Sequence, residues 1–405
     1  MGIYAIVCEY NPFHNGHRYQ IQAIRASDLD ARIVCIMSGN FVQRGDVAVM
    51  DKYVRAEMAV KAGADLVLEL PFPWCMAPAE IFSRAAMQLI DSLGNVDFLH
   101  FGSESADAAM LFRVASNMQK DIFLSEVKSL RTKEPSLRYA DILRRAYTSL
   151  FGNEDEAVFQ GSNDILALEY IKALIRMNLP IQAKCIQRTG NLYNDEHWAG
   201  AFPSASAIRK TLLADQKQVA PSEKSEFEAH CAEFYGKHEI FSLESLSTAI
   251  LAFFRLHDER KTDEIFGMNP ARAKRIFRAA SCSCTLSDLI ASACSKTDSA
   301  SGIRRALLSD MLNVSKDSMN EAPAFSLMLA ASSQGTYLLK KISPKIKIIT
   351  KPADYRFCDE RVKRQFECEM RAESLFALAS TQKRPGFSCL QKTPYIQSDR
   401  CHVNS

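Results

Sequence analysis

Residues 9–17, Glu-Tyr-Asn-Pro-Phe-His-Asn-Gly-His, have the composition of a phosphate-binding turn. They follow an apolar run over residues 3–8, which predicts a buried strand, and they lead into an amphipathic stretch. The N-terminus of a helix there would offer free N–H groups and a positive dipole end to phosphate. His14 and His17 are three residues apart, so both can point at one phosphate and stabilise charge on the α-phosphate and the leaving pyrophosphate. Gly16 would let a nucleotide come close to the backbone.

A second candidate anion-binding segment is Ser-Ala-Ser-Ala-Ile-Arg at residues 204–209. Its hydroxyls and helix start would hold the β- and γ-phosphates, and Arg209 would neutralise the charge of the leaving group. Taken alone, this segment would be read as a serine N-cap followed by a surface arginine, and an isolated His-x-Gly-His would be read as two surface histidines. Their occurrence together, each after a predicted strand, predicts nucleotide binding.

The elements that must position these residues alternate between apolar runs and amphipathic stretches. Runs that are apolar throughout are typical of strands covered on both faces, and strand and helix in turn imply right-handed crossovers. We therefore predict an α/β fold with a doubly wound parallel Rossmann-like sheet, whose ligands bind beyond the carboxyl ends of the strands. The predicted strands are residues 3–8, 32–37, 65–70, 96–101 and 181–187, and the predicted helices are 16–27, 51–62, 78–93, from about 105, and 164–177.

The pattern changes after about residue 215. Helical periodicity dominates residues 240–335, as in 242–257 and 301–312; a lysine-rich, β-prone piece follows at 345–349 and a charged helix at about 358–378. From residue 301 onward there are 17 Lys and Arg against 10 Asp and Glu, which favours a polyanionic partner for this end of the chain, although a solvated basic face is the alternative. The predicted organisation is a catalytic domain at 1–215, a connecting segment at 216–239, a mainly α-helical, basic domain at 240–380 and a flexible tail at 381–405.

Composition excludes several classes of protein. The 405 residues are 47% hydrophobic and 24% charged, and they contain no apolar run of about 18 residues, so we expect no membrane span. The chain begins directly in a strand-like segment, so we expect no signal peptide. Its 12 cysteines form no Cys-x-x-Cys pair, which favours reduced thiols in the cytoplasm over disulfides or a structural zinc.

The histidine turn and the segment ending in Arg209 resemble the two phosphate-binding motifs of the nucleotidyltransferase superfamily. Further motifs at the strand ends specify one family within this superfamily. Together the motifs are similar to those of the bacterial tRNA(Met) cytidine acetate ligase family, closely over residues 2–215 and more weakly beyond. The segments that carry it are Cys-Glu-Tyr-Asn-Pro-Phe (8–13), Met-Ser-Gly-Asn-Phe-Val-Gln-Arg-Gly (37–45), Gly-Ala-Asp-Leu-Val-Leu-Glu-Leu-Pro (63–71) and Phe-Gly-Ser-Glu (101–104).

The resemblance implies an ATP-dependent acetylation of RNA. Acetate attacks the α-phosphate of ATP, pyrophosphate leaves, and acetyl-adenylate forms. The exocyclic amine of the wobble cytidine of elongator tRNA(Met) then takes the acetyl group, giving N4-acetylcytidine and AMP. Mg²⁺ is expected to accompany ATP through phosphate oxygens, without a dedicated protein metal site.

The resemblance also implies roles for particular residues. The catalytic residues would be His14, His17 and Arg209. ATP would contact Val7, Glu9, Tyr10, Asn11, Pro12, Gly16, Gly102, Asn163, Arg188, Thr189, Ser204 and Ser206. The acetate or reactive-centre loop would be Ser38, Gly39 and Asn40. The tRNA would contact Arg44, Lys52, Arg55, Arg275, Arg304, Arg305, Lys340, Lys341 and Lys345, through phosphate contacts that add affinity and salt dependence.

Simpler readings of these residues remain open. Asn163 can be a helix cap, the loop at 38–40 can serve only its own hydrogen bonds, and each basic residue can be a solvated surface charge. The sequence also departs from the family pattern, because Lys-Thr-Asp-Ser-Ala-Ser-Gly at 296–302 stands where a Lys-Thr-Lys-x-Tyr-Thr-like segment is expected, and Ser206 stands where Thr is usual. Two alternative functions are an adenylyltransferase for a small phosphorylated acceptor and a non-catalytic tRNA-binding protein with a vestigial nucleotide fold.

Overall fold

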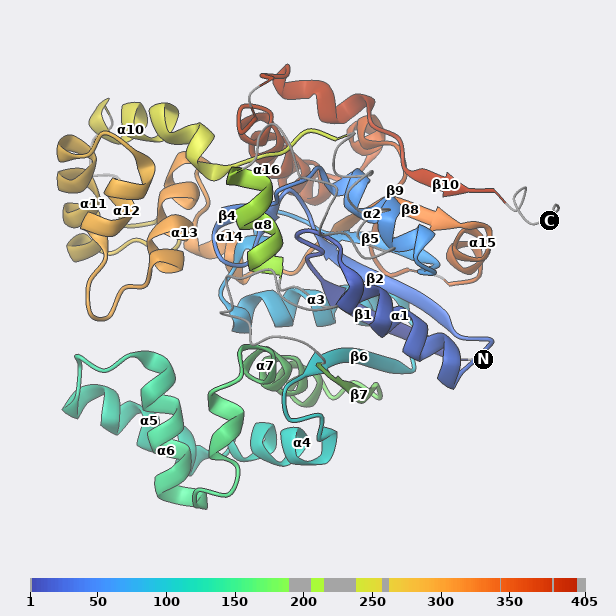
Figure 1. Cartoon of the computed structure of the whole chain (residues 1–405), viewed down its shortest axis with the longest axis horizontal. Coiled ribbons are helices and arrows are strands. Elements are labelled where there is room, and N and C mark those ends of the chain that lie inside the picture. Colours follow the sequence, from blue (N-terminus) through green and yellow to red (C-terminus); the bar gives the residue numbers. More distant parts are fainter. Residues whose placement is uncertain are drawn as a thin grey trace.

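The core of the protein is an open sheet with helices on both faces (Figure 1). The structure is a computed structural model, and it describes residues 2–188, 205–214, 238–256, 262–342, 344–380 and 382–398. The strands are hydrogen-bonded in the order β10-β8-β5-β2-β1-β6-β7, and β9 pairs with β8.

Five of these strands are parallel and correspond to the five predicted from the sequence. They are β1 (Ile3–Cys8), β2 (Arg32–Ser38), β5 (Leu66–Leu70), β6 (Phe98–Ser103) and β7 (Gln182–Gln187). Their order, β5-β2-β1-β6-β7, is that of a doubly wound fold, so the predicted fold class is confirmed for this part of the chain. The order reverses between β1 and β6, and such a reversal is where open α/β sheets bind their ligands.

The two faces of the sheet are covered by different helices, because successive side chains of a strand point in opposite directions. Ile6 of β1 packs in one core with Ile21 of α1, and Ala5 packs in the other with Ile90 of α3. The helices of this half are α1 (Asn15–Ser27), α2 (Lys52–Lys61), α3 (Ala79–Leu93), α4 (Ala108–Asn117), α5 (Asp121–Lys133), α6 (Tyr139–Phe151), α7 (Ser162–Arg176) and α8 (Ala205–Ala214), with the 3-10 turns η1 (Trp74–Met76) and η2 (Glu156–Phe159).

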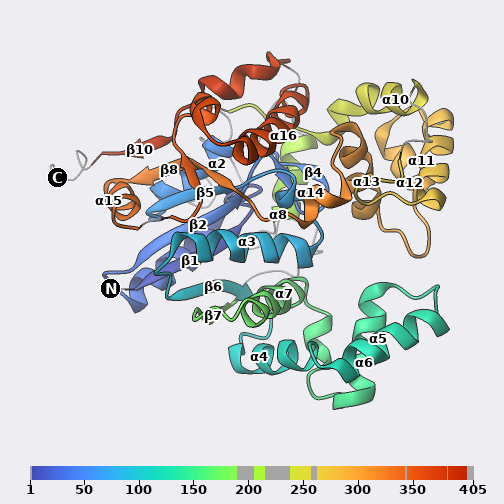
Figure 2. The same ribbon diagram turned by 180° about the vertical axis from the view of Figure 1, so that it is seen from behind.

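Two groups of helices project from the side of the sheet where the parallel strands end (Figures 1 and 2). One is the pair α5 and α6, for which the sequence analysis made no prediction. The other comprises η4 (Leu243–Leu246), α10 (Ser247–Leu256), α11 (Pro270–Cys282), α12 (Leu286–Ala293), α13 (Ala300–Met311) and α14 (Lys316–Asn320). The helices expected at 242–257 and 301–312 lie in this second group.

After α14 the chain returns to the sheet, which differs from the predicted helical domain at 240–380. Strand β8 (Phe325–Ser332) runs antiparallel to β5 and is buried along most of its length. Its composition, rich in Leu, Met and Ala, favours a helix, so burial between two layers overrides local propensity here. The remaining elements are α15 (Ser333–Lys341), β9 (Lys347–Ile349), η6 (Pro352–Phe357), α16 (Glu360–Phe376), η7 (Gly386–Gln391) and β10 (Tyr395–Gln397).

Most of the expected connection at 216–239, and the end of the expected tail at 381–405, lie outside the described residues. Across the described segments, no helix is both long and apolar enough to cross a lipid bilayer.

Candidate functional site

A cavity of about 250 Å³ opens at the carboxyl ends of β1, β6 and β7, beside the first turns of α1, α7 and α8. It lies at the reversal point between β1 and β6, where the fold favours ligand binding. Eleven of the residues expected to bind or convert ATP line it: Val7, Glu9, Tyr10, Asn11, His14, Gly16, His17, Gly102, Asn163, Arg188 and Arg209. The fold therefore brings these eleven residues together around one cavity.

The two histidines close the first turn of α1. His14 is the N-cap, and its Nδ1 accepts a hydrogen bond of 3.1 Å from the Gly16 amide. The Nδ1 of His17 accepts one of 3.2 Å from the His14 amide, and the two rings stack with centroids 3.8 Å apart. Because each Nδ1 is an acceptor, a neutral ring must carry its proton on Nε2. Each histidine therefore keeps one N–H donor for a ligand.

Both imidazoles are held in their neutral form. Burial lowers the pKa of His14 to about 3, and the charges of Arg188 and Arg209 act in the same direction. Burial also lowers the pKa of His17 well below its usual value, with His14 and Arg188 contributing. The histidines therefore donate hydrogen bonds without adding charge, and the positive charge of the cavity comes from its arginines, Arg44, Arg188 and Arg209.

Arg209 connects α8 to the turn before α1. Its guanidinium donates to the Asn11 carbonyl at 2.6 Å and to the Ser206 hydroxyl at 3.0 Å. Ser206 is thus held by Arg209 and is not part of the cavity lining, and Pro12 is buried behind the turn. The predicted ATP contacts at Thr189 and Ser204 lie outside the described residues.

On the β6 side, the cavity wall is formed by Gly102, Asn163 and Arg188. A Cβ at Gly102 would stand 3.3 Å from the Arg188 Cγ, so glycine keeps this wall open. Asn163 does not cap α7. Instead the Glu104 carboxylate accepts from the Asn163 side-chain amide at 2.6 Å and from the Asp164 backbone amide at 2.8 Å, which satisfies the free amides of this helix start.

On the β2 side, the wall is formed by Glu9 and by a hairpin of β3 (Phe41–Val42) and β4 (Asp46–Val47). The Glu9 Oε1 accepts a hydrogen bond of 2.8 Å from the Gln43 amide, and Gln43 and Arg44 line the cavity beside it. This connection ties the end of β1 to the hairpin and fixes the position of the carboxylate.

Two of the predicted RNA-binding arginines hold this hairpin from α13. Arg304 Nε donates to the Arg44 carbonyl at 3.2 Å, and an Arg305 nitrogen donates to the Gln43 carbonyl at 2.9 Å. Gly45 permits the approach, because its φ of 69° suits glycine and a Cβ there would stand 2.7 Å from the Arg305 amide. Burial lowers the pKa of Arg305 to about 10. Both side chains thus stabilise the cavity wall, and RNA contact remains a prediction for them.

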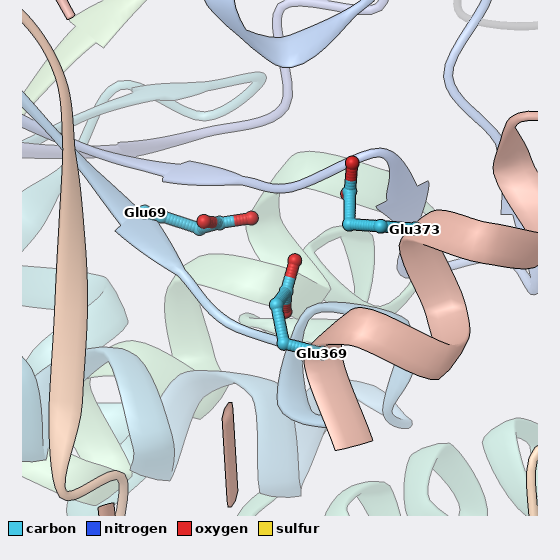
Figure 3. A group of neighbouring side chains, drawn as sticks. All are labelled: Glu69, Glu369 and Glu373. Carbon is cyan, nitrogen blue, oxygen red and sulfur yellow. The ribbon is translucent and has the colours of Figure 1, made fainter. Parts of the chain in front are cut away.

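The predicted RNA contact is wrong for Lys52, which is 1% exposed. Its ammonium lies 2.7 Å from a Glu69 oxygen, 2.8 Å from Glu369 and 3.1 Å from Glu373. The three carboxylates converge from β5 and α16 (Figure 3). Their oxygens lie within 4.8 Å of one another, close enough to hold a metal ion, but the lysine occupies the space between them. Lys52 therefore fastens α16 to the sheet.

This cluster holds one ammonium and three carboxylates. Two of the carboxyl groups have a raised pKa, so they bind protons more readily and the excess of negative charge is reduced. Burial raises the pKa of Glu69 well above its usual value, with Glu369 adding to the effect and Lys52 opposing it. Burial likewise raises the pKa of Glu373 to about 7, against the opposing charge of Lys52. Burial alone would lower the pKa of Lys52, but Glu369, Glu373 and Glu69 raise it, so the ammonium stays charged.

Arg55 is also buried completely, so its predicted RNA contact is wrong as well. Its guanidinium donates to the carbonyls of Met50 at 3.0 Å, Ser38 at 3.2 Å and Gly39 at 2.5 Å, and to that of Glu9. Arg55 thereby connects the turns after β1 and β2, because backbone carbonyls left by the ending strands need donors.

The Ser38-Gly39-Asn40 turn, expected near acetate, lies away from the cavity lining. The Asn40 side chain donates to the Glu373 carboxylate at 3.1 Å and accepts from the Lys52 amide at 2.7 Å. Ser38 and Asn40 are both buried. Asn40 therefore joins this turn to the ionic cluster around Lys52, and the turn's contact with acetate remains a prediction.

Glu69, Glu369 and Glu373 were not among the candidate residues predicted from the sequence. Glu69 lies within a buried strand, and a carboxylate at such a position signals a buried partner. Glu369 and Glu373 are four residues apart, which places both on one face of α16. These two signals could have located the cluster.

The remaining basic residues lie in two different places. Arg275 and Arg272 both form ion pairs with Asp298, the residue that departs from the family pattern. Arg275 also donates to the Ala293 carbonyl at 3.1 Å, so its guanidinium is held within the helical group, and RNA contact remains a prediction for it.

Lys340, Lys341 and Lys345 are exposed, as predicted. They lie near the amino ends of the parallel strands, whereas the cavity lies at the carboxyl ends. Strand β8 is antiparallel to β5, so α15, which follows it, begins near the amino ends of the parallel strands. The Ser332 amide bonds to the carbonyl of Asp65, just before β5, at 2.8 Å. In both views α15 and α13 lie at opposite ends of the sheet (Figures 1 and 2).

Comparison with known proteins matches residues 1–387 to the family described as HIGH Nucleotidyl Transferase. A tRNA(Met) cytidine acetate ligase of Thermoanaerobacter sp. (strain X514) is 33% identical over 386 residues, covering 94% of this chain and 96% of that protein. The ligase of the same name from Acetivibrio thermocellus is 31% identical over 407 residues, covering 96% and 97%.

Solved structures show the same similarity. The crystal structure of Thermotoga maritima TmcAL without ligand superposes with a TM-score of 0.88 at 28% identity, covering 98% of this chain and 100% of that one. The same protein bound with alpha-thio ATP gives a TM-score of 0.87 at 29% identity, with the same coverage.

Proposed function

The chain belongs to the HIGH nucleotidyl transferases and, within them, to the tRNA(Met) cytidine acetate ligases, and from this premise we propose that it acetylates the wobble cytidine of elongator tRNA(Met) with acetate and ATP. The observation that carries the proposal is the arrangement of His14, His17 and Arg209 around one cavity at the reversal point of the sheet.

In the first step, an acetate oxygen attacks the α-phosphate of ATP and pyrophosphate leaves. The Nε2–H groups of His14 and His17 donate hydrogen bonds to phosphate oxygens, and Arg209 neutralises the departing pyrophosphate. Both donors are fixed before the substrate arrives by the hydrogen bonds to their Nδ1 atoms. Phosphoryl chemistry of this kind depends mainly on positioning and charge stabilisation, which these residues supply without forming a bond to the substrate.

We propose that the adenosine occupies the β6 side of the cavity, against Gly102, Asn163 and Arg188. The resulting acetyl-adenylate then presents its acetyl group towards the β2 side. There the cytidine amine attacks the acetyl carbon, the bond to the phosphate oxygen breaks, and AMP leaves. Acetate itself is drawn to this side by the positive charge of Arg44.

Mg²⁺ fits this cavity as a companion of ATP. Among the described residues, the group of side chains able to hold a metal ion is Glu69, Glu369 and Glu373, which does not line the cavity, so phosphate oxygens and water would supply most ligands of the ion. When bound, the ion would neutralise phosphate charge; the binding and orientation steps above rest on the protein's own side chains.

We propose that the protein acts in the cytoplasm. The tRNA approaches from the carboxyl ends of the parallel strands, where its anticodon can enter the cavity. The hairpin at Arg44 and the N-terminal half of α13 with Arg304 lie at this edge. The lysines at 340, 341 and 345 lie across the sheet, roughly 20 Å away for a strand of six residues, so they could meet only a distant part of the RNA. RNA phosphates that contact Arg44 and Arg304, or the three lysines, would add salt-dependent affinity.

The function is tested in two measurements. Nucleoside analysis of total tRNA from cells with and without the protein is expected to show N4-acetylcytidine only when the protein is present. With purified protein, acetate is expected to drive exchange of labelled pyrophosphate into ATP. Exchange that needs a phosphorylated acceptor instead would favour an adenylyltransferase, and salt-sensitive tRNA binding without any ATP binding would favour a non-catalytic protein.

A further inference from the structure

The proposed reaction needs a base that removes a proton from the attacking amine, and the residues assigned so far do not include one. The amine nitrogen of cytosine shares its lone pair with the ring, so attack on the acetyl carbon requires a base to accept one of its protons. The following inference rests on the proposed function, because it concerns the second step of that reaction.

The histidines are poorly suited to be this base. The Nδ1 of His14 is occupied by the Gly16 amide and the Nδ1 of His17 by the His14 amide, so each Nε2 carries the proton of the neutral ring. Neither ring therefore presents an unprotonated nitrogen to the cavity. Breaking one of these hydrogen bonds would also leave a backbone amide at the start of α1 without its side-chain acceptor.

Glu9 is suited to the task by position. Among the lining residues that the structure describes it is the one carboxylate, and it lies on the β2 side of β1, away from the proposed adenosine wall. Its Oε1 accepts from the Gln43 amide, which fixes the carboxylate plane. Within the described residues no hydrogen-bond donor reaches its Oε2. A carboxylate accepts through both oxygens, so Oε2 is left for a ligand.

We propose that Glu9 is the general base of acetyl transfer. The amine nitrogen forms a bond to the acetyl carbon, the bond from that carbon to the phosphate oxygen of acetyl-adenylate breaks with its electron pair, and one amine proton moves to Glu9 Oε2. AMP leaves as the anion, and Glu9 later returns the proton to water. Glutamate also accepts hydrogen bonds from the cytosine amine in nucleic-acid recognition, so the same contact would orient the base before reaction.

The surroundings of Glu9 support this role. Burial raises the pKa of its carboxyl above the usual range, while the Gln43 amide and the charges of Arg209, Arg44 and Arg55 oppose the rise. A base with a raised pKa accepts a proton more readily. The arginines would also stabilise the phosphate that leaves.

The experiment separates the two half-reactions in Glu9→Gln, which keeps the size of the side chain and removes the base. Acetyl-adenylate formation is measured by acetate-dependent pyrophosphate exchange. Acetyl transfer is measured in single turnover from synthetic acetyl-adenylate to an elongator tRNA(Met) transcript. We expect transfer to fall on the order of 100-fold more than adenylate formation. Transfer by the unmodified protein should lose rate in acid as Glu9 is protonated, and Glu9→Gln should lose that dependence.

Asp46→Asn is the matched control, because it makes the same chemical change in the hairpin that contacts Glu9, at a residue outside the cavity lining. It should leave the ratio of the two rates unchanged. Glu9→Asp should recover part of the transfer rate, which a merely structural role would not explain. If Glu9→Gln fails to fold, the role of Glu9 is tested by two other measurements. These are the fall of the transfer rate of the unmodified protein at acid pH and the two half-reaction rates of Glu9→Asp.

Other outcomes overturn the inference in distinguishable ways. Equal losses in both half-reactions of Glu9→Gln, with a raised Mg²⁺ requirement, would make Glu9 a ligand of the ATP-bound metal ion. Unchanged transfer would remove Glu9 from the reaction while leaving the proposed function intact. Absence of any acetyl-adenylate from the unmodified protein would refute the proposed function itself.

Discussion

Replacing Lys52 with methionine is the sharpest test of the buried ionic cluster. The ammonium makes three contacts of 2.7, 2.8 and 3.1 Å with carboxylates and is 1% exposed, so water cannot replace it. Methionine fills a similar volume but leaves Glu69, Glu369 and Glu373 buried without a counter-ion. Removing one partner from a buried ion pair costs about 3–5 kcal/mol, and we expect a loss of this size in the free energy of unfolding.

The loss should depend on pH in a defined direction. The charge of Lys52 opposes the raised pKa of Glu69 and of Glu373, so without the ammonium both pKa values rise further above their unfolded values. The stability linked to a raised carboxyl pKa is present below the unfolded pKa and is lost as the pH rises through the folded pKa. The cost of Lys52→Met should therefore be larger at about pH 8 than at about pH 5, because protons replace the missing positive charge in acid.

The assay is urea unfolding at both pH values, followed by far-UV circular dichroism. Lys61→Met is the matched control, since Lys61 belongs to the same helix but is 42% exposed in its surface pair with Glu57. Such pairs contribute about 0.3–0.5 kcal/mol. Glu369→Gln combined with Lys52→Met should recover part of the loss. A cost of Lys52→Met no larger than that of the control, or a loss of tRNA binding at unchanged stability, would refute the structural role.

Three further predictions follow from the cavity, the cluster and the surface. His17→Ala should lower acetyl-adenylate formation by on the order of 100-fold or more, with an unchanged circular dichroism spectrum, because it removes a fixed N–H donor to the phosphate; exchange at the unmodified rate would contradict this. Burial raises the pKa of Glu373 to about 7, so its ionisation costs stability as the pH rises from about 5 to about 8, and Glu373→Gln should gain stability relative to the unmodified protein over that range in urea titrations; a constant difference would count against the raised pKa. Neutralising Lys340, Lys341 and Lys345 together should weaken tRNA binding and flatten its salt dependence while sparing pyrophosphate exchange; binding that is unchanged at every salt concentration would place the RNA elsewhere.

The parallel half of the sheet could be predicted because its residues carry local signals. Runs such as Ile-Tyr-Ala-Ile-Val-Cys at β1 are rich in β-branched residues and bounded by turn residues, so periodicity and propensity agree. Strand β8 lacked that agreement. Its Leu, Met and Ala residues favour a helix, and only pairing with β5 at the edge of the parallel sheet makes it a strand.

The residues of the candidate site also differ in whether a local sequence pattern could reveal them. His14 and His17 could be found because both lie in one short turn, so their spacing alone brings them together. Lys52 and Arg55 were assigned to RNA from the family resemblance, with a solvated surface charge as the alternative, and both expectations place them at the surface. The Lys52 partners Glu69 and Glu369 lie 17 and 317 residues away along the chain, and no local pattern reveals contacts between residues so far apart.

By itself, the sequence determined the order of the parallel strands along the chain, the turn that forms the phosphate-binding helix start, and the arginine opposite it. These depend on neighbouring residues and on the rule that parallel strands end at one edge of a sheet. Only the tertiary structure decided which cations face solvent and which are buried, which edge of the sheet carries the lysines, and that Glu9 points into the cavity. Those properties depend on packing between segments hundreds of residues apart, and burial, which sets the charge state of each group, exists only once they have packed.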